Sequence, residues 1–235
     1  MKKLLTLLLL FTSIISFSQE LTGNQLLEKA IQYHDPNGNW NTFDGELLVT
    51  MKTPKNGDRK SLIKINLPQE YFYVKASKDK NTTEYTIAKD SCKITFNGKT
   101  PTEAEKTAHN LSCKRANLYK DYYTYLYGLP MKLKDNGTII HQKTTRKTFK
   151  GKEYLVLKVS YDKKVGSDTW YFYFNPKNYA MEIYQFFKNK PDSGEYILLT
   201  EQEIINDIKF PKNRAWYYNK NDGYLGTDFL KSSNK

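Results

Sequence analysis

Three stretches of alternating apolar and polar residues follow one another between Glu153 and Phe187. Successive side chains of a β-strand point to opposite faces, so each stretch predicts a strand. The middle stretch places Trp170, Phe172 and Phe174 on one face. One face of the predicted sheet is therefore strongly aromatic at this point.

The segment Asn-Pro-Lys-Asn at 175–178 predicts a tight reversal between the second and third of these strands, because Pro presets φ and Asn tolerates turn geometry. A tight reversal places Phe174 opposite Tyr179, Phe172 opposite Met181 and Trp170 opposite Ile183. The predicted outcome is a continuous apolar wall. Its candidate ligand-lining residues are Trp170, Phe172, Phe174, Met181 and Ile183.

Strand patterns also dominate most of the remaining chain. A short helix is predicted after Thr22, and the segment at 54–58 (Pro-Lys-Asn-Gly-Asp) predicts a hairpin. Regular strands separated by polar turns favour an antiparallel sandwich or barrel-like sheet. The predicted strands outside Glu153–Phe187 are Asp44–Thr53, Arg59–Leu67, Glu70–Ser77, Thr83–Ala88, Cys92–Phe96, Thr138–Phe149, Glu195–Leu199, Ile204–Ile208 and Arg214–Asn219.

The apolar end of the chain, Tyr224–Leu230, is expected to dock back on the sheet. The sequence contains no internal repeat, low-complexity tract or linker. Residues 19–235 are therefore predicted to form a single domain.

The period of the pattern changes to that of a helix between Pro101 and Gly128. Thr102 and Glu105 have the spacing of a capping box, and tyrosines cover much of the helix that follows. Such a helix is expected to cover an apolar concavity as a lid, with Tyr122 and Leu126 lining the ligand. Its basic residues Lys114, Arg115 and Lys120 are expected to face an anionic head group or solvent.

The first eighteen residues predict a secretory signal peptide. Two lysines precede an apolar run from Leu4 to Phe17, and small residues surround the expected cleavage site. A retained N-terminal anchor is the alternative. No Cys follows the run, which argues against a lipid-anchored lipoprotein, and no later stretch approaches a membrane-spanning length. The protein is expected to be exported and to be periplasmic or secreted.

The predicted export changes what the two cysteines mean. An even number of cysteines in an oxidising compartment favours a disulfide between Cys92 and Cys113. The alternatives are two buried free thiols or a metal-binding pair. A disulfide would pin the tyrosine-rich helix to the strand that carries Cys92.

The chain is basic, with a formal net charge of +12. Between Lys106 and Lys150, ten Lys or Arg residues stand against Asp121 and Asp135 only. Such a segment suits an anionic membrane surface or an acidic envelope protein, while export argues against nucleic acid. A solvated basic face without a particular partner is the alternative.

The sequence carries no recognisable catalytic, metal or cofactor motif. The three histidines, His34, His109 and His141, are far apart, and no nucleophile motif stands beside them. His34 is expected to interact with the last carbonyls of the first helix. The protein is predicted to be non-catalytic and to need neither cofactor nor metal, and catalysis by residues that only the fold brings together is the alternative.

Three segments, Tyr123–Thr138, Asp168–Phe187 and Arg214–Asp228, resemble a secreted bacterial family of unknown function. That family is usually grouped near the outer-membrane lipoprotein-sorting proteins of the LolA/LolB type, and the order of elements is similar. The resemblance implies a mainly β (α+β) fold, with one curved antiparallel sheet forming an incomplete β-barrel and helices covering its concave face. In LolA-type proteins this concavity holds the acyl chains of a lipoprotein.

Two functions compete on this basis. The first is a non-catalytic carrier or sensor that binds a lipid or another hydrophobic ligand on the concave face. The alternative is a cell-envelope interaction or scaffold module whose aromatic residues only fill the core. An open cavity of several hundred Å3 would favour the carrier, because ligand pockets usually have volumes of about 300–1,000 Å3. A concave face closed by side chains would favour the module.

Overall fold

A computed structural model of the chain describes residues 20–188, 190 and 192–232. The predicted signal peptide, residues 1–18, lies outside the described residues. The strands in this part are β1 (Asp44–Thr53), β2 (Asn56–Asn66), β3 (Tyr71–Lys78), β4 (Asn81–Ala88), β5 (Ser91–Phe96), β6 (Thr138–Ile140), β7 (Thr145–Phe149), β8 (Lys152–Tyr161), β9 (Thr169–Phe174), β10 (Met181–Phe187), β11 (Glu195–Ile205), β12 (Ile208–Tyr218) and β13 (Tyr224–Ser232).

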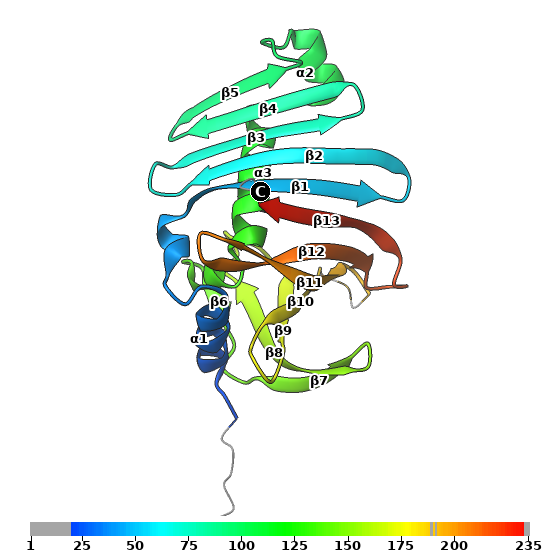
Figure 1. The fold of residues 1–235 in the computed structure, drawn as a ribbon. Coiled ribbons are helices and arrows are strands. Elements are labelled where there is room, and N and C mark those ends of the chain that lie inside the picture. The colour runs from blue at the N-terminus through cyan, green and yellow to red at the C-terminus, as the bar shows by residue number, and fades with distance from the viewer. Residues whose placement is uncertain (1–19, 189, 191, 233–235) are drawn as a thin grey trace, which may run out of the picture.

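All thirteen of these strands belong to one antiparallel sheet (Figure 1). Its order is β5-β4-β3-β2-β1-β13-β12-β11-β10-β9-β8-β6, and β7 pairs with another part of β8. The last strand, β13, lies between β1 and β12 and joins the two halves of the chain. The sheet is not closed into a barrel. The predicted fold class is confirmed, and so is the docking of the C-terminal segment.

Three α-helices accompany the described part of the sheet: α1 (Gly23–His34), α2 (Glu103–His109) and α3 (Cys113–Gly128). Two short 3-10 helices, η1 (Asn39–Thr42) and η2 (Met131–Lys134), flank them in the chain. In Figure 1, α3 runs across the strands, whereas α2 lies at the β5 edge. None of the described helices has the length and apolar character needed to cross a membrane.

The tyrosine-rich region is two helices rather than one. Asn110 adopts a left-handed conformation and ends α2, and the Ser112 side chain then caps α3 by accepting the Arg115 N–H. Within α3, Tyr123 and Leu126 are buried toward the sheet, whereas Leu118 is 58 % exposed.

Two predicted strand boundaries were also wrong. Thr138–Phe149 is interrupted at 141–144, and its two parts pair with opposite ends of β8. Residues after Glu195 form one unbroken strand, and the chain reverses at Asn206 and Asp207. Both residues have positive φ, which is the geometry of a tight hairpin turn and is tolerated by Asn and Asp.

The main hydrophobic core lies between the helices and one face of the sheet, called the inner face from here on. Phe172 and Phe174 are fully buried on this face, and Met181 and Leu126 are nearly so. Trp170 is half-buried and stacks on Phe172. Tyr122 also packs against this core, so six of the seven candidate wall and lid residues pack into the main core or against it. The predicted apolar wall is present and filled by side chains.

Ile183 does not belong to this wall. It lies on the opposite face of the sheet, in a second small core with Val156, Tyr173 and Tyr196. The connection between β9 and β10 is longer than predicted, since Asn175 and Ala180 close it with a backbone hydrogen bond of 2.9 Å. An irregularity between Met181 and Ile183 then shifts the register, because one extra residue transfers later side chains to the other face.

The observed pairs follow from this shift. Phe174 faces Met181, and Phe172 faces Tyr184. Trp170 faces Phe186 instead of Ile183.

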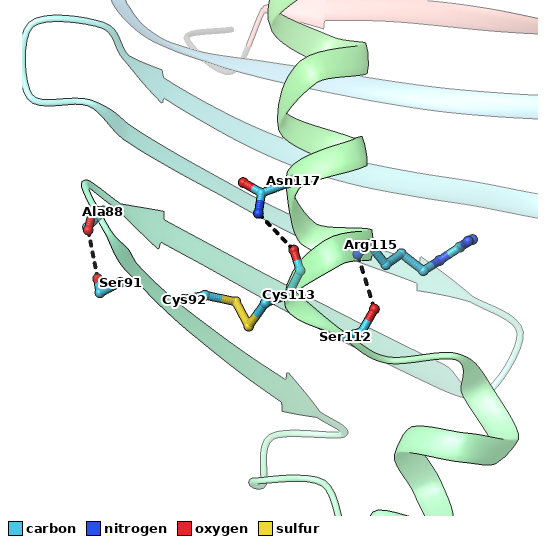
Figure 2. The surroundings of a disulfide bond; sticks show 7 residues. All are labelled: Ala88, Ser91, Cys92, Ser112, Cys113, Arg115 and Asn117. Carbon is cyan, nitrogen blue, oxygen red and sulfur yellow. Dashed lines mark hydrogen bonds between the residues drawn. A yellow bond between two sulfur atoms is a disulfide. The ribbon is translucent and has the colours of Figure 1, made fainter.

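The predicted disulfide between Cys92 and Cys113 is present (Figure 2). It joins β5 to the first residue of α3, with the two Cα atoms 6.0 Å apart. Ser112 caps the same helix end next to it. The disulfide therefore fixes the start of α3 against the edge of the sheet.

The sequence predicts that His34 bonds the last carbonyls of its own helix. The structure shows that its ring has other partners. Its Nδ1 donates to the Lys209 carbonyl at 2.6 Å, and its Nε2 accepts the Met181 N–H at 2.9 Å. These partners require a neutral imidazole. Burial lowers the pKa of His34 to about 4. The ring therefore fixes the end of α1 to β10 and β12.

Reduction of the disulfide should lower the free energy of unfolding by about 3 kcal/mol, because a loop of this size constrains the unfolded chain by roughly that amount. Urea unfolding with and without reductant, and of the Cys92→Ser/Cys113→Ser variant, measures the change. Alkylation of both thiols in the native, unreduced protein would contradict the pairing.

Acidification should destabilise the protein through His34. The unfolded state binds the proton more tightly, so the stabilisation is complete above pH 6.5 and is lost as the pH falls toward 4. The full loss is about 3 kcal/mol. Urea unfolding at several pH values should show a shallower dependence for His34→Gln than for the native chain. The control His109→Gln, which alters an exposed histidine, should leave the slope unchanged.

Phe172→Ala should lower the free energy of unfolding by about 3–5 kcal/mol, as large truncations in packed cores do. The control Phe229→Ala alters a phenylalanine that is 39 % exposed and should cost much less. Chemical denaturation compares the two variants. A Phe172→Ala protein that kept its stability and lost ligand binding would show that this side chain lines a cavity.

Candidate functional site

The inner face changes from apolar to charged toward one end of β1 and β2. On β2 the buried residues Ile65, Ile63 and Ser61 are followed on the same face by Arg59. Arg59 lies opposite Met51 of β1. The polar end of this row borders the start of α3, where its tyrosines begin.

Strand register extends this change across four neighbouring strands. Met51 pairs with Asp228 of β13, and Asp228 pairs with Arg214 of β12. Residues paired across antiparallel strands lie side by side on one face. Arg59, Met51, Asp228 and Arg214 therefore form one line across the sheet, called the charged row from here on.

The tyrosines of α3 lie over the charged row. The Tyr122 hydroxyl donates to Asp228 Oδ2 at 3.2 Å. An Arg59 Nη atom donates to the Tyr123 hydroxyl at 3.4 Å. The Arg214 guanidinium lies 3.8 Å from the centre of the Tyr127 ring. Tyrosine provides the apolar ring that the core needs and a polar group that reaches the charges.

These charges are buried at considerable cost. Arg214 is 1 % exposed and Asp228 is 2 % exposed. Burial raises the pKa of Asp228, and the guanidinium groups of Arg59 and Arg214 oppose the rise. Burial also raises the pKa of Tyr122 and Tyr127 well above the ordinary value, which keeps both hydroxyls protonated.

Several polar atoms in this region lack a hydrogen-bond partner among the described residues. They are Arg59 Nε, Arg214 Nε, Asp228 Oδ1 and the hydroxyl oxygens of Tyr127 and Tyr184. Buried polar atoms in folded proteins are almost always paired. These atoms gather around α3 and the charged row and form a polar cluster. A ligand or a water molecule there would supply the missing hydrogen-bond partners.

The chain has only four arginines among its 37 basic residues. Three of them, Arg59, Arg115 and Arg214, lie around α3, and none forms an ion pair within the described part of the chain. The fourth, Arg146, pairs with Glu153 on the surface. Arginine binds carboxylates and phosphates through a planar fork of donors, so this distribution favours an anion-binding role for the cluster.

A pocket of about 280 Å3 opens between α3 and the β1–β2 end of the charged row. We call it the arginine–tyrosine pocket. Its lining residues are Met51, Arg59, Arg115, Leu118, Tyr119 and Tyr122. Tyr119 contacts both guanidinium groups, at 5.7 Å from Arg59 and 5.6 Å from Arg115. The pocket thus combines two cations with apolar and aromatic walls.

A larger pocket of about 510 Å3 lies beside the start of α1. Arg146 and Lys29 contribute to it, together with Thr144, Thr145 and Glu20. Arg146 is already neutralised by Glu153, and the Lys29 ammonium lies 5.0 Å from the centre of the Tyr179 ring. None of its described lining residues has a buried polar side-chain atom without a partner, whereas Arg59 Nε of the arginine–tyrosine pocket is such an atom.

Sequence reasoning found only part of this site. Tyr122 and Arg115 were expected near the ligand, whereas Arg59, Met51 and Tyr119 were not. The signal in the sequence that could have identified Arg59 is the rarity of arginine in a lysine-rich chain. Trp170, Phe172, Phe174, Met181 and Leu126 lie away from the lining of this pocket, and their predicted role as ligand contacts stays a prediction.

Metal chemistry has no support in the part of the chain that the structure describes. Three or more His, Cys, Asp or Glu side chains do not gather there in an arrangement suited to a metal ion. The donor set of the arginine–tyrosine pocket consists of guanidinium and phenol groups. Guanidinium groups are cationic and accept no hydrogen bond, so they suit anions rather than metals.

Three solved structures are similar to this chain at low identity. A LolA superfamily protein from Nitrosomonas europaea has a TM-score of 0.48 and 11 % identity, with 91 % of this chain and 93 % of that chain covered. A DUF1329 family protein from Desulfovibrio piger has a TM-score of 0.47 and 8 % identity, with coverages of 90 % and 93 %. A putative outer membrane lipoprotein-sorting protein domain from Vibrio parahaemolyticus has a TM-score of 0.41 and 12 % identity, with coverages of 90 % and 92 %.

Sequence comparison identifies the family. A search of the curated proteins gave no match. A family model covers residues 2–231, which is nearly the whole chain and includes the three segments that carried the resemblance. The chain belongs to DUF6503, a family of unknown function.

Proposed function

We propose that this protein is an exported, non-catalytic binding protein for a lipid or another hydrophobic ligand, which it holds in the arginine–tyrosine pocket. The observation that supports this most directly is the pocket itself. It lies where the apolar inner face meets the charged row. The apolar part of a ligand would contact the inner face there, and its polar part would contact the charged row.

The exposed apolar surface at the pocket supports a hydrophobic contact. Leu118 is 58 % exposed on α3, and Met51 lies half-buried on the facing strand. The rings of Tyr119 and Tyr122 complete this side. The volume of about 280 Å3 is slightly below the usual range of about 300–1,000 Å3 for ligand sites, which suits one small single-chain molecule.

The chemistry of the site favours binding over catalysis. General acid–base catalysis needs a titratable group within hydrogen-bond reach of the reacting atom. Asp228 is the carboxylate of the charged row, and it is buried behind Tyr122 rather than lining the pocket. The described lining residues contribute no carboxylate, histidine or cysteine.

Export is supported by the disulfide and by the predicted signal peptide. Disulfides persist in oxidising compartments outside the cytoplasm. The Cys92–Cys113 bond holds the helix that carries four pocket residues. The basic stretch between Lys106 and Lys150 would favour exchange of the ligand with an anionic membrane surface.

One observation favours the alternative of an envelope interaction or scaffold module. Phe172 and Phe174 on the inner face are fully buried by neighbouring side chains. Those aromatic residues then act as core, as that alternative requires. The two functions differ in whether the folded protein binds an apolar molecule, so a binding experiment separates them.

A neutral fluorescent probe, N-phenyl-1-naphthylamine, should bind the folded protein at about one site with micromolar affinity. Leu118→Asp should weaken this binding by about tenfold or more, because a carboxylate on the pocket wall must be desolvated. The side chain is exposed, so thermal stability should change little. Fluorescence titration and thermal melting measure the two effects.

The matched control is Asn117→Asp. It adds the same charge to an adjacent exposed position of α3 that does not line the pocket, and it should leave probe binding unchanged. Absence of binding by any apolar probe at micromolar concentration would reject the carrier function in favour of the interaction module. Equal weakening by both variants would place the probe elsewhere.

A further inference from the structure

We infer that the ligand carries an anionic group, a carboxylate or a phosphate ester, which Arg59 and Arg115 bind together in the arginine–tyrosine pocket. This inference rests on the proposed function and names the chemical class of its ligand. It makes the protein a binder of single-chain anionic amphiphiles.

The two arginines are arranged around one ring. Both guanidinium groups line the pocket and lie within 6 Å of the centre of Tyr119. Arg59 extends from the sheet and Arg115 from α3, so they approach the pocket from opposite walls. The ring of Tyr119 attracts both cations, which favours positions of the two side chains next to the pocket. The two guanidinium groups therefore lie near one another without a ligand.

The donors of Arg59 are not fully used. One Nη atom donates to the Tyr123 hydroxyl at 3.4 Å, which is a long hydrogen bond to a neutral acceptor. Its Nε is buried and has no partner within the described residues. A carboxylate or phosphate oxygen in the pocket would provide the missing acceptor. Charge-assisted hydrogen bonds to arginine are about twice as strong as neutral ones.

The local charge is also unbalanced. Asp58, the carboxylate nearest to Arg59 in the sequence, lies 3.8 Å from the Lys52 ammonium. Asp228, the acid of the charged row, accepts from Tyr122 and already faces Arg214 across the strand pair. Arg59 and Arg115 thus share the pocket without a carboxylate in its lining. Asp228 offsets part of the charge of Arg59 from outside the lining and is shared with Arg214. The three arginines around α3 therefore exceed this one acid, and the net positive charge favours an anion.

The apolar wall decides between an amphiphile and a free inorganic anion. Met51 and Leu118 lie beside the two arginines in the same pocket. A small hydrated anion would leave these side chains in contact with water, whereas an attached alkyl chain would cover them. Each buried methylene contributes about 0.8 kcal/mol to binding. The pocket therefore fits a chain and a charged group on one molecule.

The experiment compares decanoate, 1-decanol and inorganic phosphate at about pH 8, where the fatty acid is ionised. Displacement of the neutral probe reports the two chain ligands, and isothermal titration calorimetry reports phosphate. Decanoate should bind about tenfold more tightly than 1-decanol, as expected for one additional charge-assisted contact. Phosphate alone should show no binding at the concentrations at which decanoate saturates.

Arg115→Gln and Arg59→Gln should each reduce the preference for decanoate to about two-fold or less while retaining the binding of 1-decanol. Arg59→Lys keeps the charge and should retain part of the preference. The matched control is Arg146→Gln, which removes the same charge from the surface arginine and should leave the preference unchanged. Arg115 is half-exposed, so its variant tests the inference even where Arg59→Gln fails to fold.

Each outcome is decisive. Equal affinities for decanoate and 1-decanol would overturn the anionic class and leave the proposed function intact. Binding of phosphate alone with the affinity of decanoate would replace the amphiphile with an inorganic anion. A loss of preference in Arg146→Gln as large as in Arg115→Gln would show a general charge effect and overturn the assignment to the pocket. Failure of every chain ligand to bind would reject the proposed function itself.

Discussion

The pairing of β13 with β1 is the interaction on which the rest of the structure depends. It joins the last strand of the chain to the first strand and merges two antiparallel halves into one sheet. Its register also places Asp228 beside Met51, which brings the arginines of β2 and β12 into one line. A shift of one residue would turn Asp228 to the outer face, because side chains alternate along a strand. The arginines of the charged row would then lose Asp228 as their counter-charge.

The charged row explains why the covering helix is rich in tyrosine. A helix of leucines would leave Asp228 without the hydroxyl of Tyr122 and Arg214 with only the Pro211 carbonyl, and a buried charge that loses its partners costs several kcal/mol. Phenol groups reduce this cost, because Tyr122 donates to Asp228 and the Tyr127 ring accepts the Arg214 guanidinium on its face. The disulfide fixes the start of α3, and at the other end a Cβ on Gly128 would overlap the Trp40 ring. The helix is thereby held in register with the charges beneath it.

Local patterns in the sequence predicted local structure well. The helix after Thr22, the pairing of Cys92 with Cys113 and the docking of the C-terminal segment were all predicted and are present. Ile183 was assigned to the wrong face, because alternation cannot be followed through an irregularity that the sequence does not announce. The charged row could not be predicted at all. It depends on which residue of β13 faces Met51, and strands so far apart in the sequence carry no local signal for their register.

The position of the arginine–tyrosine pocket follows from the same geometry. The inner face is apolar where the helices and the aromatic wall seal it, and it becomes charged toward Arg59. A helix that crosses such a face can pack tightly over the apolar part, since the rings there fill the space. Over the charged part, room for hydration or for a counter-ion is favourable, because a guanidinium group enclosed by apolar atoms costs free energy unless it is paired. The pocket opens at this boundary, with Leu118 and Met51 on one side and two arginines on the other. An amphiphile is the class of molecule whose own boundary between apolar and charged parts coincides with that of the protein.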